Sequence, residues 1–429
     1  MAGRLSIAVV GGGLAGLATA AALSRADFEV DVFEQAERLG EVGAGINISP
    51  QATKALTAIG LADGLKSVGN AMTGQVQRSM YTGEQLAETR LTEDGTTSDR
   101  FGAPYYVFHR ADLLDVLAGA VDSTRVHLGH RCTGLVEDGG QRGDANEDGG
   151  GGEDRGGVTL HFANGSRHRA DIVIGADGIH SRIRRELYTE EKAHFTGQMV
   201  WRALVDGSAL PADILGPHGF CGWIGQGRHI MTYYLRGTSI INITTQSDAA
   251  SWVEEGWSAK GDPDEMRSCF PGVAPPLQML LDEVRECSKW GLFGREPSAD
   301  WGRGRIQLIG DAAHPMLPNA GQGAAQAFED AFVLARWLDE SGDDPERALA
   351  EFRNVRVPRA HAIQRQSLLN SRLVHAGDWE KRQETFRARE RQGDTPLGMN
   401  WIYGYDPETE WRRRQEYPLS FAPAEDAHA

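Results

Sequence analysis

The stretch Ile7-Ala-Val-Val-Gly-Gly-Gly-Leu-Ala-Gly-Leu-Ala18 places Gly11, Gly13 and Gly16 where an apolar strand should turn into a helix. A second run, Glu29-Val-Asp-Val-Phe-Glu34, ends in a carboxylate about 20 residues further on. Glycines at this spacing let backbone N–H groups approach a pyrophosphate, and the start of a helix adds partial positive charge there. The stretch therefore predicts a dinucleotide site in an α/β, Rossmann-like fold. A glycine turn that serves only tight packing is the alternative.

Composition limits the partners that this chain of 429 residues is expected to have. Its formal net charge of −16 argues against nucleic acid and against anionic membrane surfaces as partners. No apolar run has the length needed to span a bilayer, and we interpret the apolar N-terminal stretch as strand, turn and helix rather than as a signal peptide.

The four cysteines, Cys132, Cys221, Cys269 and Cys287, are too sparse for a disulfide framework. No pair has the CxxC spacing of a zinc site, so no metal is expected. The pattern is typical of reduced thiols and predicts a cytoplasmic protein.

Two later motifs follow apolar strands and carry an aspartate in a glycine turn. They are Gly175-Ala-Asp-Gly-Ile-His-Ser-Arg and Gly310-Asp-Ala-Ala-His-Pro, which contain Asp177 and Asp311. Such turns bring carboxylates to sugar hydroxyls and let the backbone approach a ligand closely. The second motif opens a helix near Gly321–Ala324, whose first amides can face a flavin carbonyl or a phosphate.

In this order the three motifs resemble the single-component (class A) FAD-dependent aromatic hydroxylases, in the branch of salicylate hydroxylase, 3-hydroxybenzoate 6-hydroxylase and 6-hydroxynicotinate 3-monooxygenase. The resemblance covers roughly residues 5 to 375. It implies a Rossmann-like FAD-binding domain, an inserted antiparallel-sheet substrate domain and a helical C-terminal region. Further similar stretches are Gly43–Asn47, Phe108–Leu113, Trp201–Leu204, Trp290–Pro297 and Trp401–Asp406.

The resemblance also implies the roles of individual residues in binding FAD. The ADP half would be held by the glycine motif and Glu34, the flavin side by Arg110, and the ribityl chain by Asp311. Asp177 is linked in the family with both FAD and NAD(P)H, which would bind only transiently. The residues implied to bind FAD are Gly11, Gly13, Gly16, Glu34, Arg110, Asp177, Asp311, Gly321, Gly323 and Ala324.

The implied reaction is an NAD(P)H- and O2-dependent hydroxylation of a small aromatic acid through a C4a-hydroperoxyflavin. Such a reaction needs a hydrogen-bond acceptor beside the ring hydroxyl, for which histidine is suited. Among 13 histidines we favour His229, because residues i and i+4 of a strand share a face and Tyr233 follows at that spacing. An exposed strand histidine is the alternative for His229.

Three further residues are weaker candidates for substrate contacts: Asn47, His314 and Asn319. For His314, a role in shaping its loop is the alternative. Asn319 stands where some members of the branch carry His. Because of this difference, the sequence does not identify the substrate. A hydroxybenzoate such as salicylate is preferred, and a hydroxylated pyridine carboxylate is the near alternative.

The predicted domain organisation alternates along the chain. FAD-binding parts are expected at 1–70, 105–190 and 291–375, substrate-domain parts at 71–104 and 191–290, and a C-terminal helical segment at 376–429. Asp138–Gly157 has no large apolar residue, so we interpret it as a disordered hairpin loop between strands near 133–137 and 158–162. Lys381–Arg391 is interpreted as a solvated helix face. A monomer or a homodimer is expected.

Other function classes remain open at this point. They are a flavin epoxidase, urate-type hydroxylase or halogenase, a flavin-binding protein without monooxygenase activity, and a nicotinamide-only dehydrogenase. The sequence has no WxWxIP motif, which disfavours a halogenase.

Overall fold

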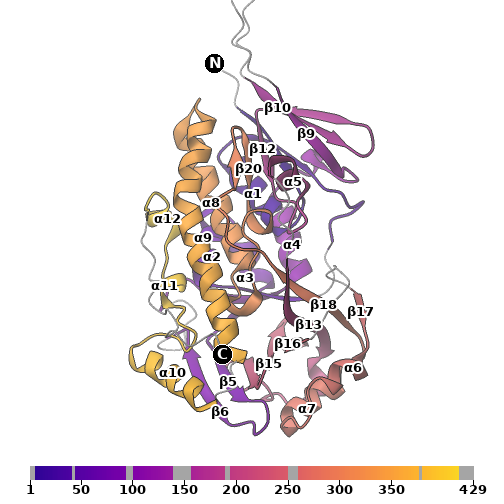
Figure 1. Cartoon of the computed structure of the whole chain (residues 1–429), viewed down its shortest axis with the longest axis vertical. Helices are drawn as coiled ribbons and strands as arrows, with labels where there is room; N and C mark the ends of the chain where they lie inside the picture. The colour runs from indigo at the N-terminus through magenta and orange to yellow at the C-terminus, as the bar shows by residue number, and fades with distance from the viewer. Residues whose placement is uncertain are drawn as a thin grey trace, which may run out of the picture.

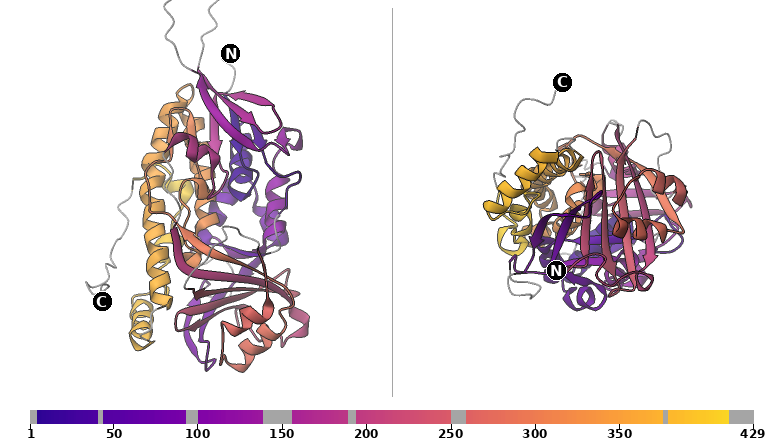
Figure 2. Two further views of the ribbon diagram at one scale, coloured as in Figure 1. Left: turned by 45° about the vertical axis from the view of Figure 1, so that its right-hand side comes forward. Right: turned by 90° about the horizontal axis from the view of Figure 1, so that it is seen from below.

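Two sheets of different kinds divide the molecule. The computed structural model describes residues 5–40, 44–92, 100–138, 156–188, 194–249, 259–375 and 379–414. A mostly parallel sheet lies in the upper half of Figure 1, and a broad, mostly antiparallel sheet lies in the lower half. The long helix α9 (Pro345–His375) runs beside both halves (Figures 1 and 2).

The parallel sheet carries the motif turns at the carboxyl ends of its strands. In the described residues its strand order is β19-β20-β12-β1-β2-β8. β1 pairs in parallel with β2 and β12, which sets Val10 beside Phe33 and Gly175. The first glycine turn, the carboxylate after β2 and the DG turn therefore meet at one edge, as the sequence predicts. The strands are β1 (Ser6–Val10), β2 (Glu29–Phe33), β8 (Val126–His127), β12 (Ile172–Gly175), β19 (Gly302–Arg303) and β20 (Ile306–Leu308).

Helices cover this sheet and bury its apolar strands. Val9 in β1 and Leu17 in α1 are fully buried, and burial of such a side chain stabilises the fold by about 1.5–3 kcal/mol. A Cβ on Gly16 would lie 1.8 Å from the carbonyl oxygen of Gly11, so the contact between turn and helix requires glycine there. The helices of this half are α1 (Leu14–Arg25), α2 (Pro50–Ala58), α3 (Ala62–Val68), α4 (Arg110–Ala118), α5 (Arg182–Leu187) and α8 (Gly323–Ser341).

The broad sheet has one face on a hydrophobic core and the other on a cavity. Its strand order in the described residues is β17-β18-β13-β16-β15-β14-β5-β6. Ile230 and Tyr234 of β15 pack in the core on one face, together with residues of α6 (Pro263–Ser268) and α7 (Pro275–Asp282). The strands are β5 (Gly74–Ser79), β6 (Gln85–Arg90), β13 (His194–Asp206), β14 (Phe220–Gly225), β15 (Arg228–Leu235), β16 (Ile240–Asp248), β17 (Ala259–Gly261) and β18 (Cys287–Gly294).

Two smaller sheets complete the strands. β9 (Cys132–Asp138), β10 (Gly157–Phe162) and β11 (Arg167–Ala170) form an antiparallel sheet, so the strands predicted around the acidic insert are present. The insert itself lies outside the described residues between 139 and 155. The other small sheet joins β3 (Gly45–Ile48), β7 (Tyr105–His109) and β4 (Asn70–Met72).

Strands β3 and β7 pair with each other, so tertiary pairing decides their conformation. One local prediction needs correction. Helix α10 (Trp379–Arg391) is not a simple solvated face, because Arg382, Phe386 and Arg389 are buried. The last helices are α11 (Asn400–Tyr403) and α12 (Pro407–Glu410).

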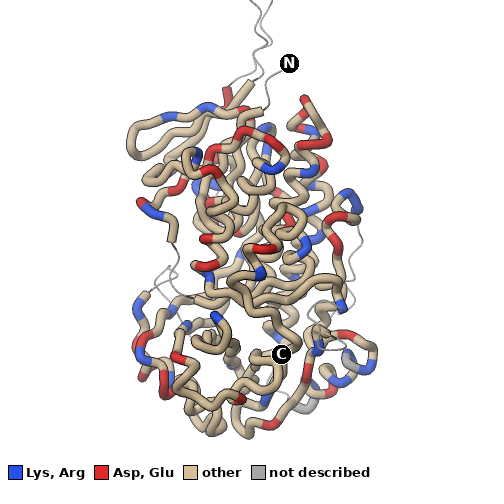
Figure 3. Tube along the Cα trace, turned by 180° about the vertical axis from the view of Figure 1, so that it is seen from behind, with Lys and Arg blue, Asp and Glu red and all other residues tan. Residues whose placement is uncertain are grey.

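Charged residues of both signs are interspersed over both halves of the molecule (Figure 3). In the part of the chain that the structure describes, no helix has both the length and the apolar character that crossing a bilayer requires. The same residues contain no group of three or more His, Cys, Asp or Glu side chains arranged to hold a metal ion. All four cysteines have free thiols.

Candidate active site

The first glycine turn and the DG turn line one cavity of about 750 Å³ at the edge of the parallel sheet. Gly11 has φ +112°, and a Cβ on it would lie 2.4 Å from the carbonyl oxygen of Ala176. Gly13 faces open space and caps helix α1 without any side-chain hydrogen bond to the helix. The start of α1 is thus left to an external acceptor, which is the arrangement that binds a pyrophosphate.

Two carboxylates that follow strands β2 and β12 border the same cavity. Glu34 accepts hydrogen bonds from the backbone N–H of Gly12 at 2.7 Å and of Ala36 at 2.8 Å. Oδ2 of Asp177 accepts from the backbone N–H groups of Arg182 and Ile183, whereas its buried Oδ1 has no partner among the described residues. Burial raises the pKa of Asp177. An unsatisfied buried oxygen beside an uncapped helix fits a ligand with hydroxyl and phosphate groups, as FAD has.

The GD turn brings together the other residues implied to bind FAD. A Cβ on Gly323 would lie 3.9 Å from Oδ1 of Asp311, and α8 begins at Gly323 without a side-chain cap. Burial raises the pKa of Asp311, although electrostatic interactions with His314 and Arg110 counteract this effect. Asp311 is nevertheless exposed to solvent in the structure. Gly321 adopts a left-handed conformation with φ +62°.

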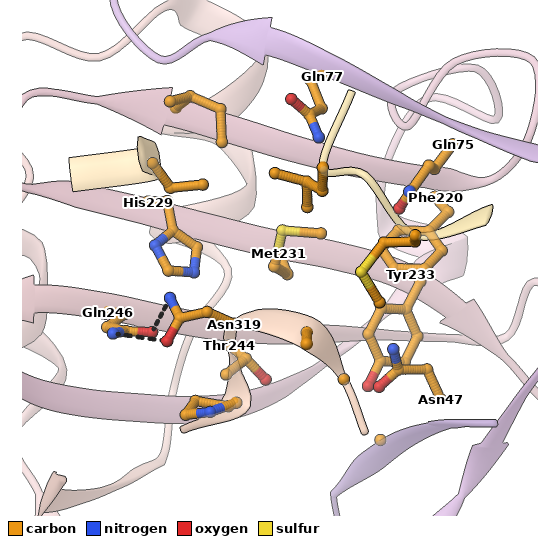
Figure 4. A pocket seen from close by; sticks show the side chains of 18 of the residues that line it. Asn47, Gln75, Gln77, Phe220, His229, Met231, Tyr233, Thr244, Gln246 and Asn319 are labelled. Carbon is orange, nitrogen blue, oxygen red and sulfur yellow. Dashed lines mark hydrogen bonds between the residues drawn. The ribbon is translucent and has the colours of Figure 1, made fainter. Parts of the chain in front are cut away.

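A separate cavity of about 180 Å³ lies between the broad sheet and the turn at Pro318–Gly321, and we call it the inner cavity (Figure 4). His229 and Tyr233 both line it, on the face of β15 that also carries Met231. The prediction that they share one face is therefore confirmed. Asn47 and Asn319 line the inner cavity as well.

His229 is buried at the wall of the inner cavity, with 8% of its surface exposed. Its Nδ1 lies 2.9 Å from Nε2 of His375. Burial lowers the pKa of His229 to about 3, with a smaller contribution from His375. The imidazole is therefore neutral at physiological pH.

Phenol groups lie on another side of the inner cavity. Burial raises the pKa of Tyr233, so its hydroxyl stays protonated. Burial also raises the pKa of Tyr105 to about 12, and the Tyr105 hydroxyl accepts a hydrogen bond of 2.6 Å from Nδ2 of Asn47. A Cβ on Gly321 would lie 2.6 Å from the same Nδ2, so Asn47 links the inner cavity to the start of α8.

Arg202 was not among the predicted site residues, although the stretch that contains it was noted. Among the described residues that line the inner cavity, it is the only one with a formal charge at neutral pH. Its guanidinium lies over the ring of Trp290, 4.7 Å from the centroid. The alternation of Trp201 and Ala203 toward the core and Arg202 toward the cavity was the available signal.

His314 does not line the inner cavity, and its placement disagrees with a substrate contact. The side chain is 1% exposed, and its Nε2 lies 2.6 Å from Oδ2 of Asp330. Its ring packs on Trp301 at 4.7 Å. Asp330 also accepts from the backbone N–H of Gly310, so His314 supports the GD turn from behind, as its alternative interpretation held.

Comparison with known proteins agrees with this geometry. The family model described as "FAD binding domain" matches residues 4–367. The chain is 35% identical to the 3-amino-4-hydroxybenzoate 2-monooxygenase of Streptomyces platensis, over 94% of this chain and 96% of the relative. It is also 35% identical to the 6-hydroxynicotinate 3-monooxygenase of Pseudomonas fluorescens, over 93% and 94% of the two chains. The chain belongs to the class A FAD-dependent monooxygenases.

The fold of this monooxygenase agrees with a solved relative. A salicylate hydroxylase in complex with its substrate is 26% identical and superimposes with a TM-score of 0.78, over 95% of this chain and 97% of the other. The predicted family, its FAD cofactor and the α/β fold with an antiparallel sheet and C-terminal helices are thereby confirmed. When bound, FAD supplies the oxygen-activating chemistry of this monooxygenase.

Proposed function

We propose that this monooxygenase uses NAD(P)H and O2 to hydroxylate a small aromatic acid that carries a ring hydroxyl, in the class of hydroxybenzoates such as salicylate. The carrying observation is the composition of the inner cavity, where Arg202 is set among apolar groups and neutral donors and acceptors, with His229 and Tyr233 on β15. A carboxylate and a hydroxyl on one flat ring match these two kinds of group.

The size of the inner cavity supports a substrate with a single ring. An apolar cavity of roughly 150 Å³ holds benzene. The inner cavity, at about 180 Å³, has room for one ring with small substituents. Phe220, Met231 and Val200 provide apolar contacts for the faces and edges of such a ring.

The strand register supports a binding mode with the two polar substituents on different strands. Met231 on β15 pairs with Thr244 on β16, which pairs with Arg202 on β13. Neighbouring strands are about 4.8 Å apart, so the backbones of Met231 and Arg202 are separated by about 10 Å. A ring between them would direct its carboxylate to Arg202 and its hydroxyl to His229. A charge-assisted pair with Arg202 would favour acids over neutral phenols.

His229 and Tyr233 have separate roles in this proposal, because four residues along a strand set them about 13 Å apart. The protonated hydroxyl of Tyr233 donates a hydrogen bond at the end of the substrate away from the ring hydroxyl. Neutral His229 accepts the proton of the ring hydroxyl and leaves its oxygen on the substrate. The negative charge that develops on that oxygen makes the ring more nucleophilic. Closure of the cavity by surrounding side chains keeps competing water away.

We further propose that the predicted cofactor residues hold FAD. Gly11, Gly13, Gly16, Glu34 and Asp177 would bind the ADP half in the cavity of the parallel sheet. Arg110, Asp311 and the backbone of Gly321, Gly323 and Ala324 would hold the flavin half, which brings its ring to the side of the inner cavity bordered by Asn47.

A hydroxylated pyridine carboxylate is the second candidate substrate. Five side-chain amides line the inner cavity, from Asn47, Gln75, Gln77, Gln246 and Asn319 (Figure 4). Amides can donate a hydrogen bond to a ring nitrogen or accept one from a ring N–H. An all-carbon ring offers neither group. The 35% identity to a 6-hydroxynicotinate 3-monooxygenase supports the same class.

A substrate panel with purified holoenzyme tests the proposal. The panel contains salicylate, 3-hydroxybenzoate, 3-amino-4-hydroxybenzoate and 6-hydroxynicotinate, with benzoate and phenol as controls that each lack one substituent. We expect one of the hydroxy acids to stimulate NAD(P)H oxidation and to yield a hydroxylated product by mass spectrometry, and both controls to yield none. Equal background oxidation with every compound would refute the proposed substrate class.

A further inference from the structure

Hydrogen-bonding side chains lead from the inner cavity to the protein surface. Nδ1 of His229 lies 2.9 Å from Nε2 of His375 at the end of α9. Nδ1 of His375 lies 3.2 Å from Oδ1 of Asp248, the last residue of β16. The side chain of His375 is 7% exposed and that of Asp248 is 63% exposed. The three groups thus form a path from a cavity wall through a buried imidazole to a solvated carboxylate.

His375 also borders a further cavity, which His229 does not line. This cavity has a volume of about 720 Å³ and is lined by Gln198 and Ser371 as well as by His375. Among the described residues, none of the charged groups around it lines the inner cavity. His229 lines the inner cavity and His375 lines the larger one, so the histidine pair connects the two.

We propose that His375 and Asp248 carry the proton of the substrate hydroxyl from His229 to solvent, and that Asp248 selects the tautomer of His229 that can receive it. The O–H bond of the substrate breaks as an Nε2–H bond forms on His229. The Nδ1–H proton of His229 passes to Nε2 of His375, and the Nδ1–H proton of His375 leaves to Asp248 or water. No electrons are transferred, and the inference rests on the proposed function.

The contacts of His375 define two alternative proton arrangements. If its Nδ1 accepts from Nε2 of Gln198 at 2.9 Å, the proton of His375 is on Nε2 and points to His229. If its Nδ1 donates to Asp248, Nε2 accepts from Nδ1–H of His229, and Nε2 of His229 becomes the free acceptor. Only the second arrangement prepares His229 as a base. A negative charge on Asp248 favours this arrangement, as the aspartate of a catalytic triad does for its histidine.

Burial explains why the proton must be passed on. With a pKa lowered to about 3, His229 does not retain a second proton near neutral pH, so uptake at Nε2 requires release at Nδ1. Burial also lowers the pKa of His375, while Asp248 counteracts this effect and Arg382 on α10 adds to it. The remaining titratable or charged groups around the further cavity that His375 borders are His194, Arg295, Glu296, Arg365 and Arg372.

The substitution D248N tests the inference, because Asp248 is exposed and its amide keeps the shape of the side chain. Exposed Asp213 offers D213N as the matched control. We take the acid from the panel that gives the highest rate and measure product formation across pH. The maximal rate, on the plateau of this pH profile, should fall roughly tenfold in D248N, a loss typical of an orienting partner. D248N should also move the acid limb of the pH profile to lower pH, because the carboxylate that raises the pKa of His375 is gone. D213N should change neither. H375Q, which contacts His229 without relaying protons, should lose about 10²-fold.

Nitrogen NMR of histidine-labelled holoenzyme without substrate gives an independent measurement. We expect Nδ1 of His229 to be protonated in the wild type and the other tautomer to gain population in D248N. An unchanged tautomer in D248N, or an unchanged plateau and acid limb, overturns the relay. If no panel acid is hydroxylated, the proposed function fails, and the NMR measurement still decides the tautomer claim.

Discussion

Glu329 on α8 and Arg356 on α9 form an ion pair of 2.5 Å in which neither side chain has any exposed surface. Arg359 contacts the same carboxylate at 2.6 Å, and Arg356 also pairs with Asp330 at 2.8 Å. These contacts join the helix that follows the GD turn to the helix that carries His375. Loss of one partner from such a cluster leaves uncompensated buried charge.

We therefore predict that E329Q lowers the free energy of unfolding by about 3–5 kcal/mol. Exposed Glu340, which pairs with Arg412, is the matched control, and E340Q should cost at most about 1 kcal/mol. Urea unfolding followed by circular dichroism measures both. Equal effects of the two substitutions would show that the buried cluster contributes no special stability.

Acid should weaken the same region. The pKa of Asp330 is lowered to about 2: burial opposes this shift, but His314 and Arg356 outweigh it. The unfolded value is about 3.9, so the stabilisation is complete above pH 4 and is lost as pH falls from about 4 to about 2. The loss amounts to roughly 2–3 kcal/mol, and the lowered pKa of Glu329 adds to it in the same direction. Unfolding measured across this range should show a smaller slope in D330N than in the wild type.

Arg202 should determine the preference for acids. We predict that R202Q raises KM for the aromatic acid by about 10- to 100-fold, or about 1.4–2.7 kcal/mol, with a smaller effect on kcat. Arg78 lies over Trp223 elsewhere in the same sheet and does not line the inner cavity, so R78Q is the control. A KM that R202Q leaves unchanged would place the carboxylate elsewhere.

Substitution of His229 should separate chemistry from cofactor binding. H229A should lower product formation by about 10²-fold or more while bound FAD, measured by its visible absorbance, stays near the wild-type level. His218, which contacts Thr73 and Glu88 outside the inner cavity, provides H218A as a control. Parallel loss of product and FAD in H229A would make His229 a structural residue.

Alanine substitutions in the glycine turn should affect folding stability at Gly16 and FAD affinity at Gly13. G16A places a Cβ 1.8 Å from the Gly11 oxygen, so we predict a lower melting temperature even without FAD. G13A meets no atom within 4 Å, and apoprotein melting should stay unchanged while FAD affinity falls. Unaltered FAD affinity in G13A would contradict a pyrophosphate at the start of α1.

Local sequence patterns predicted the cofactor half better than the rest. The turn after Val10 and the carboxylate at Glu34 are close in the chain, and parallel pairing of β1 with β2 brings them together. The shared face of His229 and Tyr233 follows from strand periodicity alone. Arg202 and His375 were missed because their positions at the site depend on the pairing of β13 with β16 and on the end of a 31-residue helix. Strand alternation around Arg202 indicates which face of β13 it occupies but not which cavity that face lines, and no short-range pattern places His375 at the site.

His314 shows the opposite error. Its place inside the GD motif suggested substrate contact, but the side chain turns away from the inner cavity toward Asp330, which lies in the following helix. Motif membership fixes the backbone path and not the direction of every side chain.

The inner cavity draws its wall from segments that are far apart in the chain, from Gly45 to Tyr403. During synthesis, the residues that we propose to bind FAD, up to Gly323 and Ala324, are made before Leu397, Met399 and Tyr403. In the order of synthesis, the chamber for the aromatic ring is therefore the last part of the site to gain its wall. Acquisition of FAD before the chamber closes would leave oxygen-activating capacity unshielded until the last few dozen residues are in place.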